Sequence, residues 1–289
     1  MTRLFNLKIK TISIVIIIFL MAISVFSKPK QILRISSLSP NITEIIYQLG
    51  GEKYLVGRSQ SCNYPSEAKK IAVVGNFASI YIEKILTTNT NLILSIPLPN
   101  LKHRQMLKKL KVKFVELEFD SIRNYCDNVM KIGKILNLQQ PAIKEVKRIS
   151  KLLKKQQRII NKVSIKKRPK VLFVIWNKPL IVVGKKSFLN EFIQLSGGVN
   201  VAKNINQSYG KVSKEWLLAQ KIDCILVTKE AATLFKASFS ESEKNIISAF
   251  KNNRIYTLQK EDEVLRLSPR MFDGIKELNG FIQNENKKN

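Results

Sequence analysis

Residues 44–51 read Glu-Ile-Ile-Tyr-Gln-Leu-Gly-Gly, and residues 191–198 read Glu-Phe-Ile-Gln-Leu-Ser-Gly-Gly, with the same spacing from the acid to the glycine pair. The first copy predicts a helix, because Ser39-Pro40 supplies an N-cap with proline in the first helical position. Apolar residues then recur with helical spacing at Ile42, Ile45, Ile46 and Leu49. A glycine pair after such a run is typical of a helix end.

A second pair of segments repeats in the same order along the chain. Glu83-Lys-Ile-Leu followed by Asn91-Leu-Ile-Leu matches Glu215-Trp-Leu-Leu followed by Asp223-Cys-Ile-Leu. One such match between amphipathic helices could arise by chance. Two matched segments in one order indicate that the chain is a pair of related lobes.

Short extended runs alternate with the predicted helices in both halves of the chain. They lie at residues 32–36, 92–96 and 112–117 in the first half, and at 170–175 and 181–184 in the second. Alternating strands and helices are typical of α/β folds. We therefore expect the fold class to be α/β, with one lobe over residues 28–139 and the other over 167–289.

A long basic helix is predicted between the lobes, over residues 140–166. One side of it is apolar, and the other carries lysines and arginines from Lys144 to Lys162. At 1.5 Å per residue the helix is roughly 30–35 Å long. A basic amphipathic helix can also bind a membrane or a nucleic acid. Because the stretch lacks aromatic residues and lies between matched lobes, we interpret it as a rigid connection packed on both.

The chain of 289 residues is strongly basic, with 50 Lys and Arg against 21 Asp and Glu and a formal net charge of +29. This charge suggests nucleic acid as a partner. The lysines are, however, spread along the whole chain, without an RGG tail or zinc-finger spacing. We therefore expect solvated basic faces and no specific nucleic-acid partner. A hydrophobic content of 45% excludes a disordered chain.

The first 27 residues have the pattern of a secretory signal peptide. A basic segment with Arg3, Lys8 and Lys10 precedes an apolar run at residues 12–26, and short side chains lead to a cleavage site after Ser27. The run is near the lower length limit for a membrane-spanning helix, so an uncleaved N-terminal anchor is the alternative. No cysteine stands near this point, which disfavours a lipoprotein. We expect a soluble mature chain that begins at Lys28 and is exported to the periplasm.

Cysteine and histidine are scarce, and this limits metal sites. The single His103 lies in a basic segment, which favours a solvated side chain over a metal ligand. Cys62, Cys126 and Cys224 cannot form a four-thiolate zinc site and allow at most one intramolecular disulfide. We expect no metal and no cofactor. An enzyme is disfavoured as well, because the sequence has no G-x-G-x-x-G after a strand and no G-x-S-x-G.

Several motifs in a fixed order carry a resemblance to a known family. They include Arg34-Ile-Ser-Ser-Leu-Ser-Pro-Asn-Ile-Thr-Glu44, residues 57–65, 74–77, 83–85, 184–188 and 195–200, and Arg266-Leu-Ser-Pro-Arg270. Together they resemble the substrate-binding proteins of ABC importers for cobalamin, ferric siderophores and haem, and the cobalamin-binding branch most closely. The resemblance spans about residues 31–282.

The resemblance implies an architecture and a function. The architecture is two Rossmann-like lobes joined by one long helix, with a ligand cleft between the lobes. The function is capture of a chelate outside the inner membrane and its delivery to an ABC permease, without chemistry. A corrinoid is the first expected ligand, and a ferric siderophore or haem is the alternative. We expect the protein to act as a monomer.

By the same resemblance, five residues of the first lobe are ligand contacts. Ser39 and Pro40 stand at the cleft end of the first strand, where amides at a helix start can meet polar ligand groups, although a plain helix cap explains them equally well. Phe77 stands where the cobalamin branch commonly has tryptophan, so a flat apolar wall remains. Ser61 and Ile96 stand where an aromatic residue is expected. These departures leave the identity of the chelate open.

Three residues of the second lobe are carried over in the same way. Trp176, just after the first strand of this lobe, is a candidate aromatic platform, although a tryptophan there also suits a core. Asp262 and Arg266 match the acid and the base that precede Ser-Pro-Arg. The planar fork of Arg266 suits corrin amides, a siderophore carboxylate or a haem propionate. The alternative is a surface ion pair with Asp262.

Glu83 and Glu215 match the family's paired docking glutamates and hold equivalent places in the internal repeat. Two separated carboxylates, one on each lobe, can each meet an arginine cluster on a two-fold permease. A favourable place near a helix N-terminus would also explain an acid at either position. We expect both residues to contact the permease.

Overall fold

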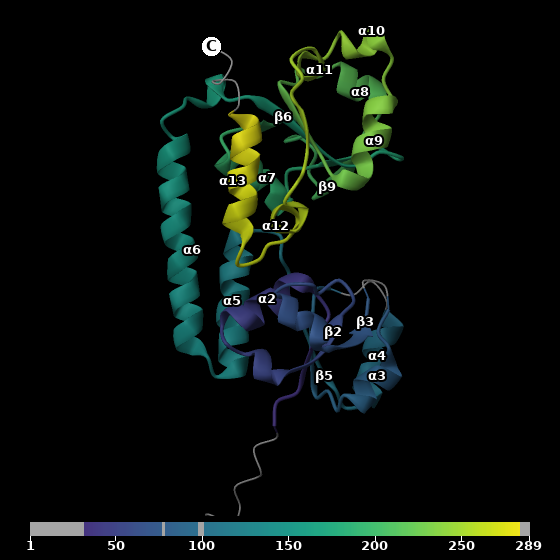
Figure 1. Ribbon diagram of the computed structural model, residues 1–289, viewed down its shortest axis with the longest axis vertical. Coiled ribbons are helices and arrows are strands. Elements are labelled where there is room, and N and C mark those ends of the chain that lie inside the picture. Colours follow the sequence, from purple (N-terminus) through teal and green to yellow (C-terminus); the bar gives the residue numbers. More distant parts are fainter. Residues whose placement is uncertain (1–31, 77–78, 98–100, 284–289) are drawn as a thin grey trace, which may run out of the picture. The chain divides into compact units, whose positions relative to one another are not determined.

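Two β-sheets with flanking helices follow one another along the chain (Figure 1). The computed structural model describes residues 32–76, 79–97 and 101–283, so the predicted signal peptide and Phe77 lie outside the described residues. The first sheet lies within residues 35–116 and the second within 170–257. The predicted α/β class with two lobes is confirmed, and we refer to an N-terminal and a C-terminal lobe by these sheets.

The sheet of the N-terminal lobe is parallel throughout, in the order β3-β2-β1-β4-β5. Its strands are β1 (Ile35–Ser37), β2 (Leu55–Ser59), β3 (Ala72–Gly75), β4 (Leu92–Ser95) and β5 (Lys113–Glu116). β1 and β4 are buried along their whole length, which suits parallel strands covered on both faces. The strand order reverses between β1 and β4, and α/β sheets bind ligands beyond the carboxyl ends of strands at such a point.

Four helices belong to this lobe: α2 (Pro40–Gln48), α3 (Ile82–Thr87), α4 (Leu101–Lys109) and α5 (Ile122–Leu136). α3 and α4 share an apolar cluster with Val74 and Ile93 of the sheet, and α2 contacts α5. Ser39 occupies the predicted N-cap position of α2. Its hydroxyl makes no capping hydrogen bond, however, and donates instead to Asn41 Oδ1 at 2.5 Å. The start of α2 therefore depends on Pro40 rather than on a side-chain cap.

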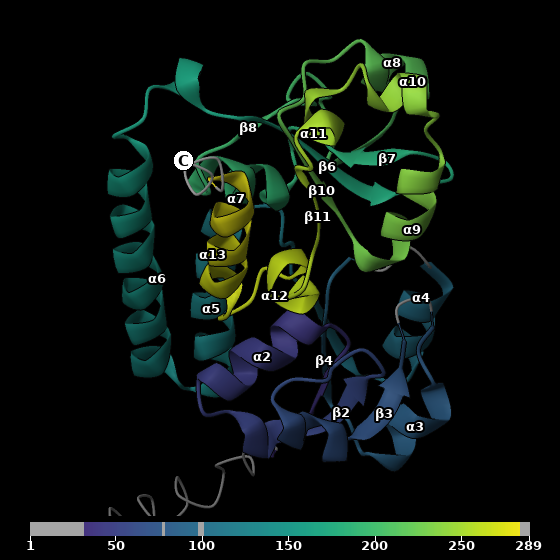
Figure 2. The ribbon, with the colours of Figure 1, turned by 45° about the horizontal axis from the view of Figure 1, so that its top comes forward.

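The long connecting helix is α6, from Gln139 to Ile160. It packs on α5 and on α7 (Phe188–Leu195) of the C-terminal lobe (Figures 1 and 2). Its 22 residues span about 33 Å. The helix ends before the predicted limit at residue 166, because Arg168 donates to the carbonyl groups of Ile160 and Val163 and holds the chain in a turn.

The sheet of the C-terminal lobe is mixed, in the order β11-β10-β6-β7-β9, with β8 paired to β6. Its strands are β6 (Lys170–Trp176), β7 (Ile181–Val183), β8 (Val199–Asn200), β9 (Tyr209–Lys211), β10 (Cys224–Val227) and β11 (Ile255–Thr257). β6, β10 and β11 are parallel, whereas β7 runs antiparallel to both of its neighbours. The two sheets therefore match on one side of the central strand, where β4 is parallel to β1 and β10 is parallel to β6. They differ on the other side, where β2 is parallel to β1 but β7 is antiparallel to β6.

Helices cover both faces of this second sheet. They are α7, α8 (Lys214–Leu218), α9 (Lys229–Ala237), α10 (Glu241–Lys244), α11 (Ser248–Lys251), α12 (Glu261–Leu265) and α13 (Met271–Ile282). Side chains of α8, α9 and α11, including Leu217, Phe235 and Ala249, share a core cluster with Leu172 and Ile225 of the sheet. α13 packs on α7.

The internal repeat found in the sequence is visible in the structure. α2 and α7 are each followed by a glycine in the left-handed region, Gly50 at φ +76° and Gly197 at φ +85°. Other residues adopt this conformation at a cost, so the repeated glycine has a backbone reason. α3 precedes β4 in the first lobe as α8 precedes β10 in the second.

A matching pair of hydrogen bonds supports the same equivalence. Asn91, just before β4, accepts from the Arg34 N–H at 3.0 Å. Asp223, just before β10, accepts from the Lys170 N–H at 2.8 Å. In both lobes a short polar side chain thus ties the start of one central strand to the start of its neighbour.

Candidate functional site

Charged side chains from both lobes meet around Glu44, on α2. The Glu44 side chain is only 1% exposed. Arg270 of the C-terminal lobe donates to both of its carboxylate oxygens, from Nε at 3.0 Å and from Nη2 at 2.9 Å. Arg266 Nη1 lies 3.4 Å from Glu44 Oε1. Because a carboxylate buried to this degree needs a partner, the folded arrangement of Glu44 depends on the opposite lobe.

Arg266 is held by partners from both lobes. Its Nη2 pairs at 2.6 Å with Oδ1 of Asp262 on α12. Its Nη1 donates to Asn63 Oδ1 at 2.8 Å, and Asn63 Nδ2 donates in turn to Asp262 Oδ2 at 3.0 Å. The three side chains close a ring of hydrogen bonds. A surface ion pair with Asp262 is therefore an incomplete description of Arg266, whose side chain is only 15% exposed and reaches the N-terminal lobe.

Arg270 has two further partners. Its Nη1 lies 2.6 Å from Oε1 of Glu263, and its guanidinium stacks over the Tyr64 ring at 3.8 Å from the ring centre. Burial alone would lower the pKa of Arg270, but the hydrogen bonds and the charge of Glu44 outweigh burial and raise it. Arg270 is therefore a fixed cation that joins the lobes.

The site residues predicted from the sequence do not include Glu44, Asn63, Tyr64 or Arg270. Glu44 lies on α2 among isoleucines, and nothing in that pattern says whether an acid is buried. The family motifs carried a usable signal, because the motif from Arg34 ends at Glu44 and the motif from Arg266 ends at Arg270.

The predicted ligand residues of the N-terminal lobe follow the carboxyl ends of its strands. Ser39 and Pro40 come after β1, Ser61 after β2 and Ile96 directly after β4. Ser61 is exposed, Pro40 and Ile96 are half-buried, and Ser39 is buried. Because parallel strands end at one edge of the sheet, these four residues belong to the same edge. Phe77 cannot be compared, because it lies outside the described residues.

Trp176 is the last residue of β6 and is 39% exposed. Its indole N–H donates to the Lys178 carbonyl at 2.8 Å. The alternative of a core tryptophan is therefore wrong, and a ring surface is open to a partner. Two buried polar atoms next to predicted ligand residues have no hydrogen-bond partner in the described structure, Ser95 Oγ before Ile96 and Asn177 Nδ2 after Trp176. Such atoms are uncommon in native proteins.

The predicted docking residues lie in the first turns of equivalent short helices. Glu83 is on α3 and Glu215 on α8, and both are exposed. Hydrogen bonds from its own backbone N–H and from the Ser213 hydroxyl lower the pKa of Glu215, so this carboxylate is charged at neutral pH. In Figures 1 and 2, α3 and α8 lie on the side of the described structure away from α6.

Comparison with known proteins gives this architecture a family. A model of the periplasmic binding proteins matches residues 35–261, which is most of the chain. The chain belongs to this family. Among the relatives of this periplasmic binding protein, the Vitamin B12-binding protein of Vibrio parahaemolyticus serotype O3:K6 is 24% identical over 265 residues, covering 90% of this chain and 92% of the relative.

Solved structures of similar proteins differ in the ligand that they are named for. A possible iron-binding (periplasmic solute-binding) protein of Staphylococcus epidermidis is 26% identical, with a TM-score of 0.73 over 88% of this chain and 99% of that one. The periplasmic heme-binding protein RhuT of Roseiflexus sp. RS-1 is 21% identical, with a TM-score of 0.74 over 87% and 98%. The family is one of substrate-binding proteins, not of enzymes.

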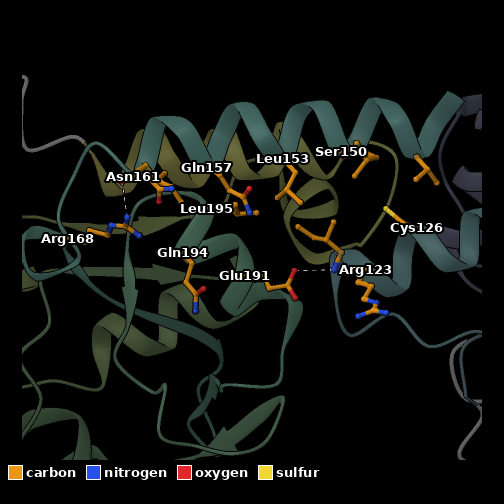
Figure 3. Close-up of a pocket in the computed structure, with 14 residues that line it drawn as sticks. Arg123, Cys126, Ser150, Leu153, Gln157, Asn161, Arg168, Glu191, Gln194 and Leu195 are labelled. Atoms are coloured by element: carbon orange, nitrogen blue, oxygen red, sulfur yellow. Dashed lines mark hydrogen bonds between the residues drawn. The ribbon is translucent and has the colours of Figure 1, made fainter. Parts of the chain in front are cut away.

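This periplasmic binding protein also has a cavity of about 680 Å³ between α5, α6 and α7 (Figure 3). In its wall, Glu191 of α7 accepts a hydrogen bond from the Ile122 N–H at 3.1 Å. Burial raises the pKa of the Glu191 carboxyl. None of the predicted ligand residues in the described ranges lines this cavity. Its walls come mainly from helices, so this cavity is distinct from the strand ends that carry the predicted ligand residues.

Within the residues that the structure describes, no group of three or more histidine, cysteine or acidic side chains could hold a metal ion. None of the helices described is long and apolar enough to cross a membrane. Cys62 and Cys126 carry free thiols. The side chain of His103 lies outside the described part of the chain.

Proposed function

We propose that this protein is the exported substrate-binding protein of an ABC importer and that it captures a corrinoid between its lobes for delivery to a permease. The observation that carries the proposal is the position of Arg266, which is held at once by Asp262 of its own lobe and Asn63 of the other. A guanidinium fixed in this way presents a planar fork without further ordering, which favours binding of a polar ligand rim.

The strand ends supply the rest of the proposed site. Trp176 offers an exposed aromatic surface at the end of β6, and Ile96 offers apolar surface at the end of β4. Flat apolar groups of this kind suit the faces of a macrocycle. Ser95 Oγ and Asn177 Nδ2 are buried next to these residues and have no hydrogen-bond partner in the described structure. Ser39, Pro40, Ser61 and Phe77 complete the proposed contacts.

A ferric siderophore or haem is the second candidate ligand of the same site. Ser61 and Ile96 replace the aromatic residues expected for a corrinoid, which favours a different chelate. The similar structures named for iron and for heme support this alternative as much as the relative named for vitamin B12 supports the first.

Export is part of the proposal. The signal-peptide pattern supports removal of residues 1–27 and a mature chain with lobes over residues 28–139 and 167–289, joined by residues 140–166. The intact mass of the exported protein tests it, because retention of residues 1–27 or a lipid adduct would contradict cleavage after Ser27.

The ligand is tested by titrating the purified protein with cyanocobalamin, haemin and several ferric siderophores. Binding is followed by calorimetry and by quenching of the two tryptophans, of which Trp176 is the exposed one. Saturable binding of cyanocobalamin alone supports the corrinoid. Tight binding of haemin or a siderophore instead transfers the proposal to the second candidate. If no chelate binds, the importer proposal is wrong.

A further inference from the structure

Positive charge is concentrated on α6 and on the turn after it. Residues 139–170 contain nine lysines and three arginines but a single acid, Glu145, whereas the whole chain has 50 basic and 21 acidic residues. Glu145 is buried, accepts from the Tyr125 hydroxyl at 2.8 Å and pairs with Arg148 at 2.7 Å. Glu145 therefore neutralises none of the positive charge on the outer side of the helix.

The outer side of α6 is a continuous basic surface. Its exposed basic side chains follow the spacing of helical turns, and together with Lys162 in the turn after the helix we call them the basic face: Lys144, Lys147, Lys151, Lys154, Lys155, Arg158 and Lys162. Among the residues that the structure describes, none of these seven has an ion-pair partner. The inner side of the helix packs on α5 and α7, so the basic face is left for something outside the lobes.

Exposed aliphatic side chains stand at the carboxyl end of the basic face. Ile159 is 48% exposed, Val163 42% and Ile165 67%. Ile159 follows Lys155 by one helical turn, and Ile165 is followed directly by Lys166 and Lys167. Single exposed aliphatic residues need no explanation, but three within seven residues, at the end of α6 and in the basic turn after it, form a mixed cationic and apolar surface.

We propose that the basic face and these three aliphatic residues form a docking surface for an anionic lipid bilayer. Lysine stems can lie along the bilayer surface with their ammonium groups at lipid headgroups, while short aliphatic side chains enter the acyl boundary. A nucleic acid offers phosphates but no apolar layer, so the aliphatic residues favour a bilayer over it.

This docking surface is separate from the proposed ligand and permease contacts. α6 lies on the opposite side of the described structure from α3 and α8, which carry Glu83 and Glu215 (Figures 1 and 2). A bilayer bound along α6 would hold the protein at a membrane without occupying those helices. The inference therefore goes beyond the proposed function and does not depend on the ligand.

The test uses sedimentation with vesicles of phosphatidylglycerol and phosphatidylethanolamine, and with neutral phosphatidylcholine vesicles. One variant replaces Lys151, Lys154, Lys155 and Arg158 by glutamine, which keeps helix propensity. A second carries Ile159→Ser and Ile165→Ser. The matched control replaces the exposed Lys221, Lys229, Lys236 and Lys251 of the C-terminal lobe by glutamine and loses the same charge. The wild type and all variants carry the same N-terminal residues, so any vesicle binding by these residues is equal in all of them.

We expect the wild type to bind the anionic vesicles and not the neutral ones. Each basic residue near an anionic bilayer contributes about fivefold in partitioning, so the α6 glutamine variant, which loses four of them, should bind about 600-fold more weakly. The serine variant, which loses apolar surface at two positions, should bind more weakly, by about tenfold or less. The matched control should stay near the wild type. Equal losses in both glutamine variants would mean that only net charge acts, and would overturn the proposal. A second pair of results would also overturn the proposal: the protein binds duplex DNA through these lysines, and the serine variant binds vesicles as tightly as the wild type.

Discussion

At the scale of single residues, Glu44 and Glu191 hold equivalent places in the internal repeat, and both reach the opposite lobe. Glu44 meets the guanidinium groups of Arg266 and Arg270, whereas Glu191 accepts a hydrogen bond from the Ile122 N–H at the start of α5. In the first case the buried carboxylate has two cationic partners. A single neutral donor does not offset burial in the second, and the pKa of Glu191 is raised.

Glu191→Gln should therefore change how stability depends on pH. Because burial raises the folded-state pKa above the ordinary 4.5, the folded protein binds more protons than the unfolded one between these two values, and the wild type loses stability as pH rises through that window. Glutamine keeps an acceptor for Ile122 and cannot ionise. The stability of the variant relative to the wild type should therefore be greater at about pH 7 than at about pH 4. Urea unfolding at both pH values measures this, with the exposed Glu230→Gln as control. A stability difference that does not change with pH would contradict it.

Arg266→Ala should weaken binding of the chelate identified by titration by about 1.5–3 kcal/mol, as expected for a lost charge-assisted hydrogen bond. The variant also removes the ring with Asp262 and Asn63. Arg168→Ala is the matched control, because among the described residues this arginine donates to the backbone carbonyls of Ile160 and Val163 near the end of α6. Calorimetry gives both affinities. An unchanged affinity for Arg266→Ala would exclude Arg266 from the site.

At the scale of elements, the contact between α5 and α6 depends on a missing side chain. Gly133 lies within α5, and a Cβ there would overlap the Cβ of Ala142 and lie 3.1 Å from the Leu138 carbonyl oxygen. Neither neighbour is the end of a flexible side chain, so the backbones would have to separate. The glycine lowers helix propensity but allows α6 to lie close against the N-terminal lobe.

Gly133→Ala should therefore destabilise the protein by about 1–3 kcal/mol through overpacking, although alanine is the better helix former. Gly280→Ala, within α13, is the matched control, because its added Cβ meets nothing within 4 Å. That change should stabilise by about 0.4–1 kcal/mol. Urea unfolding of both variants tests the pair. If both changes stabilised the protein, close packing at Gly133 would be wrong.

At the scale of the whole molecule, the two lobes are joined in two different ways. α6 connects them covalently and packs on helices of both, and the Glu44 network joins them by ion pairs. The helix is a continuous element, whereas paired side chains can exchange partners. We expect adjustment between the lobes on ligand binding to occur at the network, with α6 as the fixed connection.

Charge reversal of both Glu83 and Glu215 to lysine should abolish ligand uptake by cells while leaving ligand affinity unchanged. Each exposed carboxylate is proposed to meet a cationic site on the permease, and two like-charge contacts oppose docking. Reversal of the exposed Glu52 and Glu230, again one on each lobe, is the control. Uptake of labelled ligand and calorimetry on the purified variants separate transport from binding. Normal uptake in the Glu83 and Glu215 variant would exclude them as docking contacts.

The sequence by itself determined the two-lobe α/β fold, the connecting helix and the strand ends that carry Ser39, Ser61, Ile96 and Trp176. Periodicity and glycine positions report how each residue sits within its own element, which is local information. The tertiary structure alone decided that β7 runs antiparallel and that Glu44 pairs with Arg270, 226 positions away. A buried charge takes whichever partner the docking of the lobes brings near, and no local pattern encodes that distance.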